Sequence, residues 1–412
     1  MTEIGVAEAA AGAGRLDRFS RNAERRSFVA ACGAHALHDG YTDLLYVLLP
    51  LWQAEFGLGY AEIGLLRALY AGSMAGFQVP AAALADRLGG PLVLALGTAL
   101  AGVGYLVAGI SAGVALLLVA LAVGGLGASV QHPIASSLVA HAFAGRRSRT
   151  ALASYNFAGD LGKMAVPAAT AGLVVMMPWR SATLLLGLAA LAAAAGVMAL
   201  LRGGSAEAGA AEPAPSGACS ETATAGRGFP LLLAIGIIDS ATRMGFLTFL
   251  PFLLRLKGAE LPLIGVALTL VFTGGAAGKL VCGFLGARLG VIPTVFLTEG
   301  LTAVGILALL PLPLGAGLAV LPLIGVALNG TSSVLYGTVP ELVAPERRRR
   351  AFSIFYTGAI GAGALSPVLY GLASDAMDVP AMMGLVAAVV LVTLPLAWAL
   401  RPALQATTAS SS

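Results

Sequence analysis

The sequence predicts an all-α membrane protein with twelve transmembrane helices in two six-helix pseudo-repeats. Three observations predict this class: an apolar composition, twelve apolar runs of spanning length, and an internal repeat. Of 412 residues, 58% are hydrophobic and only 11% are charged, and the mean hydropathy is +0.89. An ordinary soluble domain carries about 25% charged residues. The composition therefore excludes a water-soluble fold.

The apolar runs end at glycine, proline or charged residues, and each approaches the length of about 20 residues that a spanning helix needs. The first six helices are expected at 28–52, 61–84, 91–110, 113–138, 150–177 and 181–201. The second six are expected at 230–254, 262–286, 291–312, 316–340, 351–373 and 380–400. The N-terminal bundle thus covers 28–201, and the C-terminal bundle covers 230–400.

Three polar segments flank the two bundles. Residues 202–229 are rich in glycine, alanine, serine, proline and glutamate, and they are expected to form a flexible linker because they cannot bury enough apolar surface to order themselves. Residues 1–27 contain five arginines and lack the apolar core of a secretory signal, so we expect a disordered tail. Residues 401–412 form a short C-terminal tail.

The distribution of basic residues predicts the orientation in the membrane. If both termini are cytoplasmic, 17 of the 24 lysines and arginines fall in cytoplasmic segments and 3 in external ones. This bias is the one that the positive-inside rule describes. We therefore expect a multi-pass protein of a bacterial inner membrane with cytoplasmic termini, and contact between its basic loops and anionic lipid headgroups.

The chain repeats itself at one ungapped offset of 201 residues. Three pairs of segments show it most clearly: LP at 49–50 and 250–251, AALADRLG at 82–89 with GFLGARLG at 283–290, and RRSR at 146–149 with RRRR at 347–350. Two bundles related in this way enclose a solute site near the middle of the membrane. Alternating access then follows from rocking one bundle against the other.

The segment AALADRLGGP at 82–91 lies between the second and third helices and resembles the signature of the major facilitator superfamily. Asp86 and Arg87 match that signature, whereas its closing basic pair is missing; in the second copy Arg288 matches and Ala287 replaces the acid. The resemblance implies the major facilitator fold. It also implies that Asp86, Arg87 and Arg288 act in gating, as a charge relay that closes the cytoplasmic side.

Two further segments resemble the fosmidomycin-resistance-like branch of this superfamily. HALHD at 35–39, followed by LLP at 48–50, is similar to the branch pattern in the first helix, and GLGASVQHP at 125–133 is similar to its pattern in the fourth. The branch resemblance implies drug resistance through an antiporter that exports drugs or small anions against protons. The substrate itself is not identified by it.

Charged side chains inside a membrane helix cost about 2.5 to 3.5 kcal/mol each, so those found there need partners or a wet cavity. His35, Asp39 and Asp43 recur every four residues on one face of the first helix. A carboxyl beside an imidazole in a cavity is suited to carry protons. We therefore predict proton coupling at these three residues, with a purely structural helix contact as the alternative for Asp39 and His35.

Substrate contacts are predicted for Arg67 in the second helix, His132 before a proline in the fourth, and Lys279 in the eighth. A guanidinium can bind an anion through two hydrogen bonds, or pair with Asp43. The alternatives are that Arg67 and Lys279 extend to the membrane surface and that His132 only packs. Tyr155 is a further candidate, although it matches a tyrosine in the second repeat.

Asn156 completes the predicted substrate contacts. Asp160 with Lys163, three residues apart, and Asp239 with Arg243, four apart, have spacings that permit salt bridges within one helix. They are assigned to gating, with structural neutralisation as the alternative. 

A buried place at a helix interface is expected for Glu299. No phosphate-binding loop of the G-x-x-x-x-G-K-[ST] kind is present, which argues against direct use of ATP. No catalytic arrangement, cofactor motif or metal-ligand spacing is found, and the basic residues are not gathered as for nucleic-acid binding.

We therefore predict a secondary transporter, not an enzyme, that exports a small drug-like or anionic compound by proton-coupled alternating access. Its expected partners are this solute, protons and membrane lipids, and we expect a monomer. Import of a small metabolite or organic anion is the alternative within transport. A membrane sensor or scaffold that has lost transport is the alternative of another class.

Overall fold

The computed structural model describes residues 3–143, 146–202, 228–344 and 347–411, with side chains from residue 22 to 405 except those of 146, 149 and 349. Most of the predicted linker lies outside these residues. The N-terminal half contains α1 (Glu3–Phe56), α2 (Tyr60–Gly76), α3 (Gln78–Leu88), α4 (Gly90–Gly109), α5 (Val114–Ala128), the π-helix η1 (Gln131–Ala135), α6 (Ser136–Ala142), α7 (Arg146–Met176) and α8 (Trp179–Leu201). The C-terminal half contains α9 (Gly228–Leu256), α10 (Leu261–Leu289), α11 (Val291–Leu309), α12 (Leu314–Thr338), the 3₁₀-helix η2 (Val339–Glu341), α13 (Arg348–Met377), α14 (Val379–Leu391) and α15 (Thr393–Ser411).

These elements form the expected two sets of six spans when α2–α3, α5–η1–α6 and α14–α15 each count as one. Among the described residues, nine helical stretches are long and apolar enough to cross a membrane. The other three spans are α1, α2–α3 and α7. Two of these, α1 and α7, carry several charged side chains within their apolar stretches, and α2 is short. Polar residues are therefore concentrated on a few helices.

Three spans that the sequence predicted as continuous helices are interrupted, and each has a proline within or shortly after the interruption. Pro80 follows the break at Phe77, Pro133 lies in η1, and Pro395 follows the break at Val392. A proline ring has no N–H and clashes with the carbonyl four residues earlier, which explains the local change of helix type. In the fourth span the irregular turn carries His132 toward the centre of the protein.

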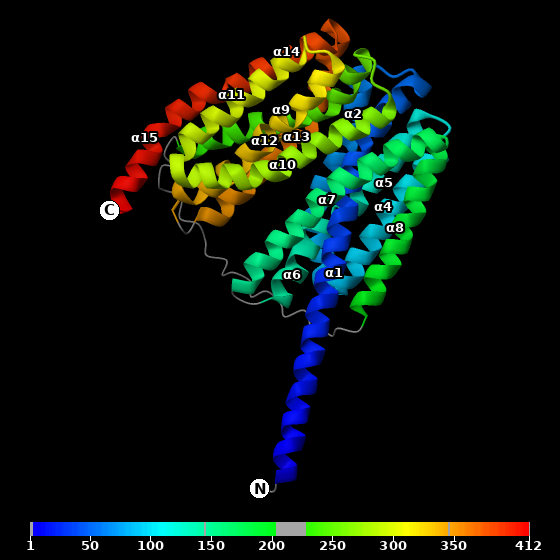
Figure 1. Cartoon of the computed structure of the whole chain (residues 1–412), viewed down its shortest axis with the longest axis vertical. Helices are drawn as coiled ribbons and strands as arrows, with labels where there is room; N and C mark the ends of the chain where they lie inside the picture. Colours follow the sequence, from blue (N-terminus) through cyan, green and yellow to red (C-terminus); the bar gives the residue numbers. More distant parts are fainter. Residues whose placement is uncertain (1–2, 144–145, 203–227, 345–346, 412) are drawn as a thin grey trace.

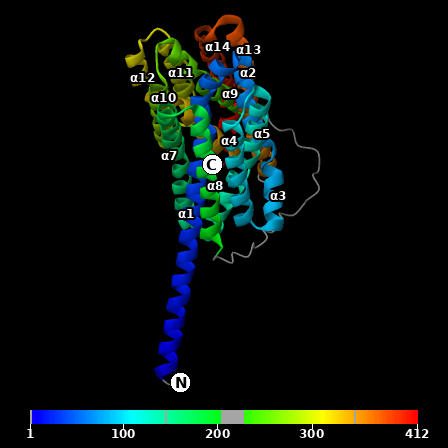
Figure 2. The same ribbon diagram turned by 90° about the vertical axis from the view of Figure 1, so that its right-hand side faces the viewer.

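The first helix is longer than the sequence predicted. α1 begins at Glu3 and not near residue 28, so the expected disordered tail is wrong for this structure. Figures 1 and 2 show this helix extending well beyond the bundle. Residues 3–18 contain five alanines, two glutamates and two arginines, which are strong helix formers, and this local preference continues the helix outside the apolar region.

The offset of 201 residues is visible in the backbone. Gly57 and Gly258, each just after the first helix of its half, both have positive φ, of 64° and 87°. Gly89 and Gly290, each between the second and third spans, have φ of 89° and 85°. Glycine adopts this conformation without steric cost. The two halves therefore share their turns as well as their helices.

One end of the molecule holds the two halves together, and we call it the closed end; the other, where α8 ends and α9 begins, is the linker end. At the closed end the carboxylate of Asp375 on α13 accepts hydrogen bonds from the backbone of Tyr60 (2.7 Å) and Ala61 (2.9 Å) at the start of α2. Gly64 packs directly against the backbone of Pro367, where a Cβ would lie 2.1 Å from the carbonyl oxygen. These contacts join the halves tightly.

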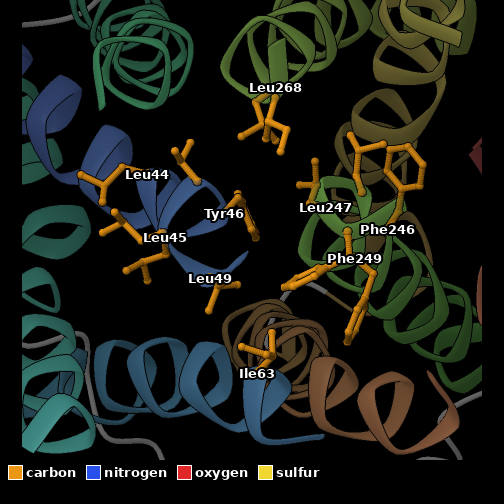
Figure 3. Close-up of a cluster of buried hydrophobic side chains, with 14 of the residues drawn as sticks. Leu44, Leu45, Tyr46, Leu49, Ile63, Phe246, Leu247, Phe249 and Leu268 are labelled. Carbon is orange, nitrogen blue, oxygen red and sulfur yellow. The ribbon is translucent and has the colours of Figure 1, made fainter. Parts of the chain in front are cut away.

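The hydrophobic core also differs between the closed end and the linker end. Toward the closed end one cluster spans both halves, and Figure 3 shows part of it, with Leu49 and Tyr46 of α1 facing Phe249 and Leu247 of α9 across a shared interior. Toward the linker end each half has a separate core of its own. The halves therefore part toward the linker end, as the ribbons in Figure 1 suggest.

Candidate functional site

A cavity of about 540 Å³ lies between the two halves, beyond the shared core. Both halves line it, and Phe355, in the first quarter of α13, marks its extent toward the linker end. Its polar and charged lining residues are Asp39, Thr42, Asp43, Tyr46, Arg67, Gln78, His132, Asp160, Lys163, Ser240, Arg243, Lys279, Asn329, Ser332, Ser333, Tyr336 and Tyr356. The cavity is thus the polar chamber that the repeat predicted.

Asp39 is the centre of a charged cluster in the N-terminal half. Its Oδ2 lies 3.2 Å from His35 Nε2 and 3.3 Å from Lys163 Nζ, and its Oδ1 lies 4.0 Å from His132 Nε2. α1, α7 and η1 bring these four side chains together. The sequence predicted the contact between His35 and Asp39, but it placed Lys163 with Asp160 instead.

The hydrogen bonds of His35 require a proton between this residue and Asp39. His35 Nδ1 lies 2.9 Å from the carbonyl oxygen of Tyr155, which can only accept, so Nδ1 must carry a hydrogen. A neutral imidazole then has a lone pair on Nε2, facing a carboxylate oxygen. The contact is a hydrogen bond only if a proton sits on Nε2 or on the carboxyl. The two side chains are therefore close enough to form a hydrogen bond, and Lys163 contacts the same carboxylate oxygen.

The cluster is held in place by close packing of α7 on α1. The rings of Tyr155 and His35 stack with centroids 4.1 Å apart, and Gln131 donates a hydrogen bond of 2.7 Å to the Tyr155 hydroxyl. Gly159 leaves room for the pair, because a Cβ there would lie 2.5 Å from His35 Nε2 and 2.8 Å from Asp39 Oδ2. α7 therefore both positions and constrains His35 and Asp39.

A second ion pair crosses from one half to the other. Lys279 Nζ on α10 lies 2.6 Å from Asp160 Oδ1 on α7, next to the cavity. Lys279 thus pairs with a residue of the other half. The salt bridge that the spacing of Asp160 and Lys163 permits is not formed, because Lys163 turns to Asp39 and Asp160 turns to Lys279. On α7, Lys163 thus contacts a residue of the N-terminal half, and Asp160 contacts a residue of the C-terminal half.

Arg67 is almost completely buried and faces the cavity instead of extending to the membrane surface. The residue is 2% exposed. Its guanidinium donates one hydrogen bond of 3.2 Å to the Tyr46 hydroxyl and lies over the Tyr46 ring. Its Nε and Nη1 atoms have no hydrogen-bond partner. Asp43 lies within electrostatic reach but forms no ion pair among the described residues. Two buried donors of Arg67 are therefore unsatisfied among the described residues.

Arg243 is the cavity's second arginine, and it does not pair with Asp239 as its spacing permitted. It lines the cavity and donates a hydrogen bond of 3.3 Å to the Ser332 hydroxyl on α12. Asp239, one turn earlier on α9, points away from the cavity toward Glu299 on α11. Glu299 is buried at a helix interface, as predicted. 

The residues predicted for gating by family resemblance lie outside the cavity. Asp86 and Arg87 are exposed at the end of α3, and among the described residues they form no ion pair. Arg288 is exposed and lies over the ring of Phe284 on its own helix, 4.2 Å from the centroid. In this conformation the halves are apart at that end. The predicted latch is therefore not engaged here.

Two predicted substrate contacts do not reach the cavity. Tyr155 is buried beneath His35, and Asn156 is exposed; neither lines the cavity. The repeat counterpart Tyr356 does line it. Tyr46 and Gln131 were missed, because tyrosines and glutamines in an apolar helix give no signal before their neighbours are known.

Three side chains could hold a metal ion by geometry. The ligand atoms of His35, Asp39 and His132 all lie within 4.8 Å of one another. The sequence placed only the first two together, so the structure adds a third. Lys163, with its ammonium 3.3 Å from Asp39, opposes a second cation at the same carboxylate.

Comparison with known families supports the interpretation of the fold. The model of the Major Facilitator Superfamily matches residues 31–231 and 231–411, one match for each half. No curated protein matches the chain.

Solved structures show the same fold. A bacterial homolog of the human lysosomal transporter Spinster, in an inward-facing and occupied conformation, superposes with a TM-score of 0.76 at 15% identity, over 92% of this chain and 97% of that chain. The inward-facing and unoccupied structure of a bacterial Spinster homolog superposes with a TM-score of 0.75 at 15% identity, over 93% and 98%.

Proposed function

The chain belongs to the Major Facilitator Superfamily, and we propose that it exports a small drug-like or anionic compound in exchange for protons. It is a multi-pass membrane transporter and not an enzyme. The fold alone does not determine the coupling ion, the direction of transport or the class of solute. The proposal also keeps the chain in the fosmidomycin-resistance-like branch, on the segments 35–39 and 125–133.

The observation that carries the proposal is the contact of 3.2 Å between His35 Nε2 and Asp39 Oδ2 at the edge of the cavity. Asp39 lines the cavity, so the proton can reach the solute chamber. When the proton leaves, the Nε2 lone pair of His35 faces a carboxylate, and Lys163 remains as the counter-charge. Loss or gain of one proton therefore changes the interactions between α1 and α7. This is the kind of switch that coupling requires.

The charges of the cavity favour an anionic solute. Lys163 and Lys279 are each paired with an aspartate, which leaves Arg67 and Arg243 without an ion pair among the described residues. Asp43 is the carboxylate within reach of both. A carboxylate or phosphonate-like group could accept hydrogen bonds from Arg67 Nε and Nη1, which have no partner in the empty cavity. His132, Lys279 and Arg67 are then the residues that contact the solute.

The same arrangement suggests how access alternates. The halves are joined at the closed end and apart at the linker end, and in the proposed bacterial inner membrane the linker and both termini face the cytoplasm. The structure then corresponds to a state open to the cytoplasm. The gating residues Asp86, Arg87 and Arg288 would engage when this side closes. We expect a monomer to suffice, because each chain has its own cavity.

Transport into inverted membrane vesicles tests the proposal. A panel of small organic anions and neutral drug-like compounds is offered with and without an imposed pH gradient. We expect gradient-dependent accumulation of anions by the wild type, and loss of that dependence in Asp39→Asn. Glu260→Gln, which changes an exposed carboxylate at the start of α10, is the matched control and should behave as the wild type.

Gradient-dependent accumulation by Asp39→Asn at the wild-type level would contradict the proton role of Asp39. Accumulation in whole cells separates the directions, because an exporter lowers the intracellular solute when the protein is present and an importer raises it. A protein that moves no member of the panel would favour the sensor or scaffold hypothesis.

A further inference from the structure

A pair of buried carboxyl groups lies in the C-terminal half, away from the cavity. Asp239 on α9 is 4% exposed and Glu299 on α11 is 1% exposed. Their side chains are in hydrogen-bonding contact with each other, and neither lines the cavity. Glu299 Oε1 has no hydrogen-bond partner at all. The Asp39 cluster does not include either residue.

The pair occupies the repeat position of a polar contact in the other half. At the offset of 201 residues, Asp239 corresponds to His38 and Glu299 corresponds to Thr98. His38 Nε2 and Thr98 Oγ1 lie 3.0 Å apart between α1 and α4. The first and third spans of each half therefore meet through one side-chain pair. In the C-terminal half two acids have replaced an imidazole and a hydroxyl.

Two carboxyl groups can form a hydrogen bond only if one of them carries a proton, because an ionised carboxylate has no donor. Two adjacent buried carboxylates would also repel each other at low dielectric, which favours one shared proton. We propose that Asp239 and Glu299 form a second proton-binding site, within the C-terminal half. This site goes beyond the coupling role of Asp39 and does not depend on it.

Arg243 links the acid pair to the cavity. It lies one helical turn from Asp239 on α9, lines the cavity, and interacts electrostatically with both acids. When the shared proton leaves, the pair gains a negative charge, and the guanidinium is attracted away from Ser332 toward Asp239. Protonation leaves Arg243 facing the solute. The site therefore adjusts the charge offered to an anion.

The surroundings hold few other charges that affect this proton. On α12 the hydroxyl of Thr331 lies beside Glu299, and on α13 Tyr356 lies near Arg243. α14 carries no ionisable residue, and on α15 the ionisable residue is Arg401, exposed near the linker end. Among the described residues, Arg243 is thus the charged group that responds to the pair.

Infrared spectroscopy of the full chain in lipid bilayers tests the site without a transported solute. A protonated carboxyl has a stretching band separate from that of a carboxylate, and the band shifts in D₂O when its proton exchanges. We expect such a band at neutral pH, its loss in both Glu299→Gln and Asp239→Asn, and its reversible disappearance as the pH is raised. Glu260→Gln, at an exposed carboxylate, should keep the band.

Two results would overturn the proposal. One is a spectrum in which neither Glu299→Gln nor Asp239→Asn changes any protonated-carboxyl band while both variants keep the wild-type thermal stability. The other is a band that persists at every pH at which the protein stays folded, because that proton would be structural. Asp39→Asn distinguishes the two sites: it should remove coupling in the vesicle assay and leave the band of the acid pair unchanged.

Discussion

The two halves have the same helices and turns, but they differ at the positions that correspond to His35 and Asp39. In the N-terminal half His35 and Asp39 lie in contact beneath α7, and we propose that this pair carries the coupled proton. In the C-terminal half the repeat counterparts are Gly236 and Ser240. Gly236, the counterpart of His35, has no side chain, and the ring of Phe355 occupies the space beside it. This ring lies 2.6 Å from where a Cβ of Gly236 would be.

The helices that pack against these two positions, α7 and α13, also differ between the halves. Gly159 leaves space for the His35–Asp39 pair, whereas its counterpart in the second repeat is Ile360, a large side chain that lines the cavity. Arg67 likewise has the buried Leu268 as its counterpart. The comparison teaches that equivalent positions of a duplicated scaffold can carry ionisable side chains in one half and apolar or neutral ones in the other.

The largest effect is expected from Gly159→Ala. The added methyl would overlap His35 Nε2 and Asp39 Oδ2, and overpacking of this kind costs about 1 to 3 kcal/mol. We expect at least about tenfold loss of gradient-driven transport, because about 1.4 kcal/mol corresponds to a factor of ten. Gly172→Ala on the same helix is the control, because no atom lies within 4 Å of its Cβ position.

Full coupled transport by Gly159→Ala would show that the His35–Asp39 geometry is not needed, and would remove the main difference between the halves. Equal losses in Gly159→Ala and Gly172→Ala would instead point to a general weakness of α7.

Arg67→Leu, which copies the counterpart Leu268, should have the next largest effect. Hydrogen bonds to charged groups contribute about 1.5 to 3 kcal/mol, so the affinity for anionic solutes should fall at least about tenfold. Neutral solutes should be unaffected, and stability should be unchanged or higher, because a buried and partly unpaired charge is removed. Binding measured against both solute classes, with Arg67→Lys as the charge-preserving variant, checks this. An equal loss for neutral solutes would contradict it.

A smaller effect is expected at the closed end from Asp375→Asn. The carboxylate lies at the N-terminus of α2, where a negative charge contributes about 0.3 to 1 kcal/mol. The ratio of open to closed molecules at this end should therefore increase about two- to fivefold. It is measured from the distance distribution between spin labels on the exposed Leu65 and Leu372. Asp378→Asn, which changes a cap within the C-terminal half, should leave the distance distribution unchanged.

The sequence predicted the fold well because hydropathy and the repeat are properties of whole segments. It predicted the partners of charged residues less well, since a partner depends on how each helix is rotated about its axis. Lys163 and Asp160 have the spacing of a salt bridge, yet they face different helices. The contact of Asp375 with Tyr60 joins residues 315 positions apart and has no sequence signal. Proline positions alone do not predict the broken helices, because Pro50, Pro167 and Pro251 lie inside continuous ones.

The role of Asp39 in proton coupling is tested most directly by measuring protons that a solute moves. Liposomes containing the protein and an internal pH dye receive an outward gradient of a transported anion, with no imposed pH gradient. The wild type should change the internal pH as the anion moves, whereas Asp39→Asn should bind the anion and leave the pH constant. A change of internal pH in Asp39→Asn equal to that of the wild type would contradict the account.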